Sequence, residues 1–326
     1  MIYVLYAIIT ACVIGFSIGL SYYVDELDKK TNLSGAFIGG VMLAAVTSLP
    51  ELFTSISSTV FLDEVQLVSG NILGSNIFNT ALLGLLIFIC VKQFKKAAIT
   101  SSHRNTLKFL MIIYGVIFIA TSIGRDFTFF GVSVFSIIIM LLYVTGIRRM
   151  SGDEGTEESC ESQCNLSVKQ IYVRFILLSL GLIACSIGIT IVTDIIAKKL
   201  NLGVTLAGAL FLGIATSLPE VTASVSLVRK GNFNAMIGNL VGSNLFNFCI
   251  LFLTDIMYIK GSIYQTSDQV YLLTVFGFIS TVFSYGILKM KKEHAKEIDK
   301  QRSSLPYALA SILVVAGYVT YITMSI

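Results

Sequence analysis

The sequence predicts an all-α integral membrane protein with ten transmembrane helices, arranged as two inverted repeats of five helices each. The first observation is composition: of 326 residues, 55% are hydrophobic and 13% are charged, against about a quarter charged in soluble domains. The mean hydropathy is +0.83. The second observation is a series of ten apolar stretches of membrane-spanning length. The third is a set of motifs that the two halves of the chain share in matching positions.

Each apolar stretch is long enough to cross the hydrocarbon core of a bilayer, which takes about 20 helical residues. The first stretch lacks a basic leading segment and is long enough to span, so we expect a membrane helix there and no cleaved signal peptide. The ten predicted helices cover roughly residues 2–24, 33–62, 66–91, 106–123, 127–147, 170–197, 202–228, 234–258, 268–288 and 305–326.

A polar segment between the fifth and sixth stretches divides the chain. It holds five acidic residues between Asp153 and Glu161 and no long apolar run. We therefore expect a first five-helix repeat over 1–147, an acidic linker over 148–169 and a second five-helix repeat over 170–326. A solvated linker is favoured over a regulatory Ca²⁺ site, because the segment lacks the ligand spacing of an EF-hand loop.

The two halves match at a nearly constant offset. Asp25 and Leu33 recur as Asp194 and Leu202, 169 residues further along. Repeats with an odd number of spans must face opposite ways across the bilayer, which predicts inverted topology. Loops after the odd-numbered helices, with the adjoining helix ends, hold 19 of the 23 Lys and Arg. Since basic residues stay cytoplasmic, we expect a protein of the cell (inner) membrane with both termini outside and the linker inside.

One polar motif occurs twice inside these apolar stretches, as TSLPE at Thr47–Glu51 and again at Thr216–Glu220. A carboxylate in mid-membrane is costly, and the proline beside it breaks the helix and frees a backbone carbonyl. A chain that carries this motif in matched positions is typical of transporters that hold an ion between two repeats.

Each TSLPE motif is followed by a second shared string, GNILGSNIFN at Gly70–Asn79 and GNLVGSNLFN at Gly238–Asn247. Within each string, polar residues recur every four positions and form one helical stripe. The Gly-xxx-Gly spacing beside the stripe favours close helix packing. The predicted cation ligands are Glu51, Glu220, Thr47, Ser48, Thr216, Ser217, Ser75, Asn79, Ser243 and Asn247.

Two further asparagine pairs lie near these residues. Asn71 and Asn239 belong to the stripes but lie a turn away, so both a ligand role and a packing role stay open for them. Asn76 and Asn244 fall on another helix face, which favours packing.

The chemistry of this set favours a hard cation. It offers carboxylate, hydroxyl, amide and carbonyl oxygens without sulfur or imidazole, which suits Ca²⁺ or Na⁺ and argues against zinc or copper. Two glutamates match the charge of one divalent ion. We expect inorganic cations and the lipid bilayer as partners, no nucleic acid, no cofactor and no enzymatic activity. A monomer is sufficient for such transport.

The cysteines and histidines form no zinc or haem pattern. Cys160 and Cys164 share the acidic linker, where a redox or metal role stays open. His103 and His294 lie far apart among lysines and arginines, and we expect both to be solvated loop residues.

The paired motifs TSLPE…GSNIFN and TSLPE…GSNLFN resemble the alpha-repeats of the calcium/cation antiporter superfamily, which includes the sodium/calcium exchangers. The resemblance implies alternating access, in which helices 1 and 6 slide past the other eight. It also implies that Glu51 and Glu220 coordinate Ca²⁺ and Na⁺, and that the Thr–Ser pairs, the serines and the final asparagines of the motifs line the site. This sequence departs from the sodium/calcium exchangers at Asn247, where they typically have aspartate.

The expected function is secondary active antiport of Ca²⁺ against Na⁺, with H⁺/Ca²⁺ or other divalent cation exchange as the alternative. Two other classes are less favoured. A cation channel more often repeats subunits than inverts halves. An intramembrane hydrolase is disfavoured because HExxH is absent and neither histidine has a mid-span serine near it in sequence.

Overall fold

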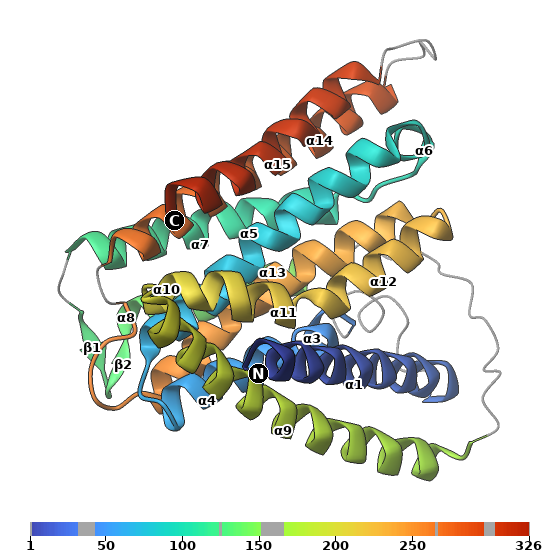
Figure 1. Cartoon of the computed structure of the whole chain (residues 1–326). Coiled ribbons are helices and arrows are strands. Elements are labelled where there is room, and N and C mark those ends of the chain that lie inside the picture. The colour runs from blue at the N-terminus through green and yellow to red at the C-terminus, as the bar shows by residue number, and fades with distance from the viewer. Residues whose placement is uncertain are drawn as a thin grey trace.

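The structure is a computed structural model that describes residues 2–31, 43–123, 126–150, 166–264, 267–296 and 304–325. The described part is almost entirely helical (Figure 1). Most of the predicted linker, with Cys160 and Cys164, lies outside the described residues, as do residues 32–42. The elements are α1 (Ile2–Thr31), α3 (Leu43–Thr47), α4 (Leu49–Val60), α5 (Val65–Ile89), α6 (Val91–Lys96), α7 (Ser102–Ile123), β1 (Thr128–Phe129), β2 (Val132–Ser133), α8 (Val134–Met150), α9 (Val168–Leu200), α10 (Val204–Ala207), the π-helix η2 (Gly208–Leu212), α11 (Gly213–Thr216), α12 (Leu218–Arg229), α13 (Phe233–Met257), α14 (Asp268–Lys296) and α15 (Leu305–Ser325).

The membrane class of the fold is confirmed. Within the described residues, seven helices are long and apolar enough to cross a membrane, or eight if the bent pair 204–216 and 218–229 forms one span. Helix α8 has 17 residues, and the start of the predicted second helix lies outside the described part. The count of ten spans therefore stays a prediction.

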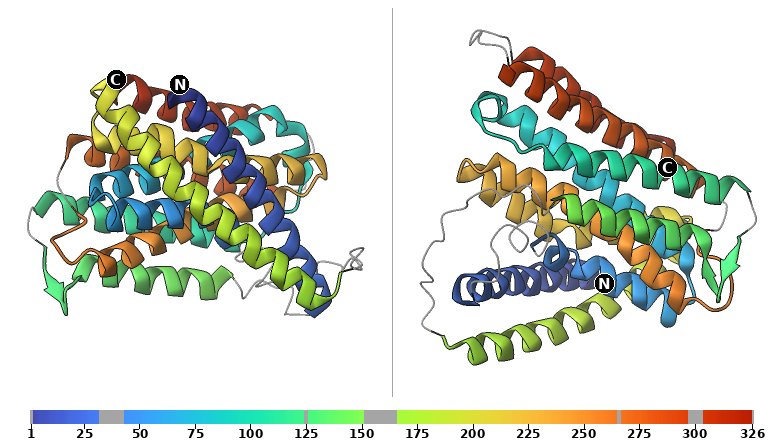
Figure 2. Two further views of the ribbon diagram at one scale, coloured as in Figure 1. Left: turned by 60° about the horizontal axis from the view of Figure 1, so that its bottom comes forward. Right: turned by 180° about the vertical axis from the view of Figure 1, so that it is seen from behind.

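Helices α5 and α13 form the centre of the molecule, and α1 and α9 lie at its edge. In the most apolar window of each helix, 78% of the residues in α5 and 83% in α13 are buried, against 17% in α1 and 28% in α9. Figure 1 shows α1 and α9 together on the side away from α14 and α15, and Figure 2 shows the same pair crossing in front of the other helices. Each of the two peripheral helices contacts the other more than it contacts any other element.

Both proline motifs break their helices, as predicted. Helix α3 ends at Thr47 and α4 begins at Leu49, while α11 ends at Thr216 and α12 begins at Leu218. In each case the proline lies in the first turn of the new helix. Backbone N–H groups in a first turn have no acceptor within the helix, so the N–H that proline lacks costs no helical hydrogen bond there. The second break bends the chain by 43°. The three polar residues of each motif, Thr, Ser and Glu, therefore lie at the helix break or in the first turn after it.

The first Gly-xxx-Gly pair brings α5 against the broken helix of the other repeat. A Cβ atom added to Gly70 would lie 2.1 Å from the Thr205 carbonyl oxygen, and one added to Gly74 would lie 2.5 Å from the Cα atom of Ala209. Any larger residue would push the two backbones apart. The predicted close approach is confirmed here. The π-helix η2 at this contact was not predicted, although such distortions are common at functional sites.

The prediction for His103 is wrong. His103 lies in α7 with 6% of its surface exposed, and its Nε2 atom is 3.0 Å from Oδ1 of Asn234. It fits because Gly238 leaves room: a Cβ atom there would lie 3.1 Å from Cε1 of the imidazole. Gly238, the first glycine of the second Gly-xxx-Gly pair, therefore makes room for the His103 side chain. His294 lies within α14, and its side chain is outside the described part.

A short hairpin connects α7 to α8. Strands β1 and β2 pair antiparallel, with Thr128 opposite Ser133. Phe130 and Gly131 form its two-residue turn with φ values of 52° and 80°, as a tight hairpin requires. The Ser133 N–H donates to Oδ2 of Asp255 at 2.8 Å, which ties the hairpin to the end of α13.

Candidate cation site

The two motif glutamates are completely buried and are held by serines of the opposite repeat. Oε1 of Glu51 accepts a hydrogen bond from Oγ of Ser217 at 3.1 Å, and Oε1 of Glu220 accepts one from Oγ of Ser48 at 3.0 Å. Oγ of Ser75 adds a longer bond of 3.5 Å to the same oxygen of Glu51. The exchanged serine bonds show that the two TSLPE motifs, 169 residues apart, meet in the middle of the protein.

All ten predicted site residues are 0% exposed, and hydrogen bonds between the repeats connect several of them. The hydroxyls of Thr47 and Ser243 are 3.3 Å apart, and both lie near the Ala44 carbonyl, at 3.2 and 3.4 Å. The Thr216 hydroxyl donates to the Leu212 carbonyl at 2.8 Å. The structure therefore brings together side chains that the sequence distributes over four separate segments.

Four oxygens of these residues accept no hydrogen bond from the residues that the structure describes. They are Oε2 of Glu51, Oε2 of Glu220, Oδ1 of Asn79 and Oδ1 of Asn247, two from each half of the chain. Buried acceptors nearly always have a partner, and buried carboxylates need an opposite charge or a proton. A hard cation with oxygen ligands meets both needs at once, so this donor set fits a dehydrated Ca²⁺ or Na⁺.

The role of Asn71 can now be assigned. Its Nδ2 atom donates to the hydroxyls of Thr54 and Ser55 at 2.9 and 3.0 Å, and its Oδ1 atom accepts from Thr216 at 3.3 Å. Asn71 therefore fastens α5 to the broken helices of both repeats. Its mate Asn239 donates to Ser224 at 3.2 Å, which serves the same purpose within the second repeat.

Packing was favoured for Asn76 and Asn244, and their side chains do bond across the contact between α5 and α13; in addition, each bonds to a predicted site residue. Nδ2 of Asn79 donates to Oδ1 of Asn244 at 3.1 Å, and Nδ2 of Asn247 donates to Oδ1 of Asn76 at 2.9 Å. The sequence contains a signal for this role, because each string has an asparagine three positions before its final asparagine.

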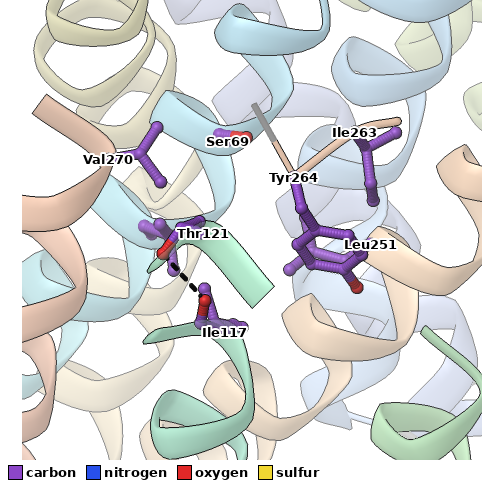
Figure 3. A pocket seen from close by; sticks show the side chains of 8 residues that line it. Ser69, Ile117, Thr121, Leu251, Ile263, Tyr264 and Val270 are labelled. Atoms are coloured by element: carbon purple, nitrogen blue, oxygen red, sulfur yellow. Dashed lines mark hydrogen bonds between the residues drawn. The ribbon is translucent and has the colours of Figure 1, made fainter. Parts of the chain in front are cut away.

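A cavity near the hairpin is too small to bind an organic substrate. Figure 3 shows it lined by Ser69, Thr121, Tyr264 and apolar side chains, with the Thr121 hydroxyl donating to the Ile117 carbonyl. Its volume of about 10 Å³ holds roughly one water molecule. None of the ten predicted site residues lines it, so it is separate from the cation site.

The chain matches a known protein family and a curated relative over nearly its whole length. The model of the sodium/calcium exchanger protein family matches residues 1–151 and 171–326. The inner membrane protein YrbG of Escherichia coli (strain K12) is 24% identical over 315 residues, which cover 94% of this chain and 90% of that protein.

Two solved structures share the fold. The H⁺/Ca²⁺ exchanger CAX has a TM-score of 0.74 at 14% identity, with 99% of this chain and 90% of that chain covered. The sodium-calcium exchanger NCX_Mj has a TM-score of 0.60 at 21% identity, with 99% of both chains covered. The chain therefore belongs to the sodium/calcium exchanger protein family, a family of membrane exchangers rather than enzymes, as the paired motifs predicted.

Proposed function

We propose that this protein is a secondary antiporter that exchanges Ca²⁺ for Na⁺ at one site between Glu51 and Glu220. The observation that carries the proposal is the set of four buried oxygens without a hydrogen-bond donor, on Glu51, Glu220, Asn79 and Asn247. The exchanged serine bonds keep each Oε1 atom occupied, which leaves each Oε2 atom for the transported ion. The hydroxyls of Thr47, Thr216, Ser75 and Ser243 complete the lining.

Coupling follows from the charge of the site. Two carboxylates in a dry interior are costly unless a cation or protons neutralise them. The neutralised site can change its exposure from one side of the membrane to the other, while the empty, charged site changes it far less readily. Ca²⁺ and the counter-ion compete for the same oxygens, so the exit of one ion must be followed by binding of the other.

Asn247 bears on the counter-ion. With an amide there, the site carries two formal negative charges, from Glu51 and Glu220. One Ca²⁺ balances two monovalent ions at such a site, and a third Na⁺ has no anionic partner. Two protons can satisfy the same glutamates, so H⁺/Ca²⁺ exchange is the second candidate. The likeness to the H⁺/Ca²⁺ exchanger CAX, with a TM-score of 0.74, supports that candidate.

For the architecture, we propose ten spans in two inverted repeats, 1–147 and 170–326, joined by a cytoplasmic linker over 148–169. The family model matches the chain in two corresponding pieces, and the paired serine bonds relate the halves nearly symmetrically. The 19 Lys and Arg in the predicted cytoplasmic loops support termini outside the cell membrane.

The peripheral pair α1 and α9 is the moving unit. All ten site residues belong to this chain, and we propose that a monomer is sufficient for transport.

The test is uptake of ⁴⁵Ca²⁺ into proteoliposomes, driven in parallel by a Na⁺ gradient and by a pH gradient. We expect uptake driven by Na⁺, and the H⁺/Ca²⁺ alternative expects uptake driven by the pH gradient instead. Asn247→Asp shows whether this position determines the coupling. Uptake that persists without either gradient would indicate a channel, and no Ca²⁺ uptake under any gradient would refute Ca²⁺ transport.

A further inference from the structure

We propose that Asn76 and Asn244 are positioning residues that turn the side-chain oxygens of Asn79 and Asn247 toward the transported cation. This inference rests on the proposed function, because it assigns a role to two residues that do not touch the ion. It addresses a problem particular to carboxamides: an amide presents either an oxygen or an NH₂ group, and only the oxygen can coordinate a cation.

The orientation begins at two backbone carbonyls where α5 and α13 pack together. Nδ2 of Asn244 donates to the Asn76 carbonyl at 3.1 Å, and Nδ2 of Asn76 donates to the Asn244 carbonyl at 3.3 Å. A carbonyl only accepts hydrogen bonds, so each of these amides must direct its NH₂ group toward the opposite backbone. The oxygen of each amide then points the other way.

The second step transfers this orientation to the ligands. Oδ1 of Asn244 accepts from Nδ2 of Asn79, and Oδ1 of Asn76 accepts from Nδ2 of Asn247, at 3.1 and 2.9 Å. If Asn79 were turned over, its oxygen would face the oxygen of Asn244 and two acceptors would repel. The bond therefore leaves Oδ1 of Asn79 for the ion, and the same holds for Asn247.

Burial makes this arrangement effective. All four asparagines are at most 2% exposed, so water cannot replace a lost partner. Oδ1 of Asn79 and Oδ1 of Asn247 accept no hydrogen bond from the residues described here, as expected of atoms reserved for a cation. The two pairs are related by the same offset of 168 residues, and each repeat therefore orients the ligand of the other.

The crossed connection gives a sharp test. Asn244 acts through Asn79, so Asn244→Leu should raise the apparent KM for Ca²⁺ about tenfold, the effect of one lost buried hydrogen bond. The same substitution should change KM less than about twofold in an Asn79→Ala background, where the oriented oxygen is already gone. In an Asn247→Ala background it should keep its full, roughly tenfold effect. Asn76→Leu should show the opposite pattern.

Thr254→Val is the matched control. The Thr254 hydroxyl donates to the carbonyls of Ile250 and Leu251, both at 2.9 Å, and bonds to neither Asn76 nor Asn244, so the KM of Thr254→Val should stay within about twofold of wild type. Folding is checked by size-exclusion profile in detergent, and Ala replaces Leu if a Leu variant is not monodisperse. Ca²⁺-induced thermal stabilisation provides a second measure of affinity.

The outcomes separate the two proposals. Effects that are equal in both backgrounds, with wild-type Ca²⁺ exchange intact, overturn the positioning role alone. A wild-type protein without Ca²⁺ flux and without stabilisation by Ca²⁺ or Na⁺ overturns the proposed function, and this inference with it.

Discussion

Glu51→Gln and Glu220→Gln are the substitutions that most directly change the charge of the site. Glutamine preserves the size of the side chain and still has an oxygen that can accept the serine bond of 3.1 Å or 3.0 Å. It removes one of the two negative charges, so a bound Ca²⁺ would be left with a net positive charge in a fully buried site. Removing one partner of a buried ion pair costs about 3–5 kcal/mol.

This free energy corresponds to a loss of Ca²⁺ affinity of about 100- to 5,000-fold. Because the two glutamates are equally buried and have equivalent serine partners, both variants should lose a similar amount. The assay is ⁴⁵Ca²⁺ flux at a concentration well below the wild-type KM. We expect flux near the background of protein-free liposomes for each variant.

The same reasoning predicts an effect on stability. Without a cation, the wild-type protein holds two buried carboxylates close together, so either Gln variant should be as stable as wild type or more stable. A ligand at 100 times its Kd stabilises a protein by about 2.7 kcal/mol. Ca²⁺ should therefore raise the melting temperature of wild type and leave that of both variants unchanged.

Asp255→Asn is the matched control, since it makes the same chemical change at a carboxylate that is 3% exposed and bonds to Ser133 instead of the site. It should retain Ca²⁺ flux per folded molecule. Near-normal flux in both Gln variants would refute the two-glutamate site, and loss of flux in Asp255→Asn alone would place the essential charge elsewhere.

Three further predictions concern packing and the supporting hydrogen bonds. Gly70→Val should abolish folding or cost more than about 3 kcal/mol of unfolding free energy, because even a Cβ atom would overlap the neighbouring backbone; Gly115→Ala, with nothing within 4 Å, should be neutral in thermal melts. Ser217→Ala should lower Ca²⁺ affinity by about tenfold while the protein still folds, and an unchanged KM would contradict its role at Glu51. Lys260→Met removes an exposed ion pair of 2.8 Å with Asp63 and should change stability by less than about 1 kcal/mol in denaturant titrations.

The glutamates, the proline breaks and the polar stripes could be recognised in the sequence because each costs free energy in a membrane and each occurs twice. The duplication also identified which polar residues belong together, and the structure buries all ten completely. The exchange of partners could not be predicted from either motif alone, because the Ser48 hydroxyl bonds to Glu220 of the other repeat.

Features that depend on how the helices pack could not be predicted from one segment at a time. Periodicity set Asn76 on a different face from Asn79, yet both side chains bond to Asn244, because α13 packs there and supplies a matching asparagine. His103 appeared solvated because its sequence neighbours are charged, whereas Gly238 and Asn234 come from a segment more than 130 residues away. Both cases need the contact between α13 and the first repeat.

The central claim is that one cation binds between the two repeats, and locating a bound ion tests it most directly. A crystal structure with Ca²⁺, its position fixed by anomalous scattering, should show the ion about 2.3–2.6 Å from Oε2 of Glu51 and Oε2 of Glu220. Oδ1 of Asn79 and Oδ1 of Asn247 should lie within the same coordination sphere. An ion bound elsewhere, or one that reaches only one of the glutamates, would contradict the account.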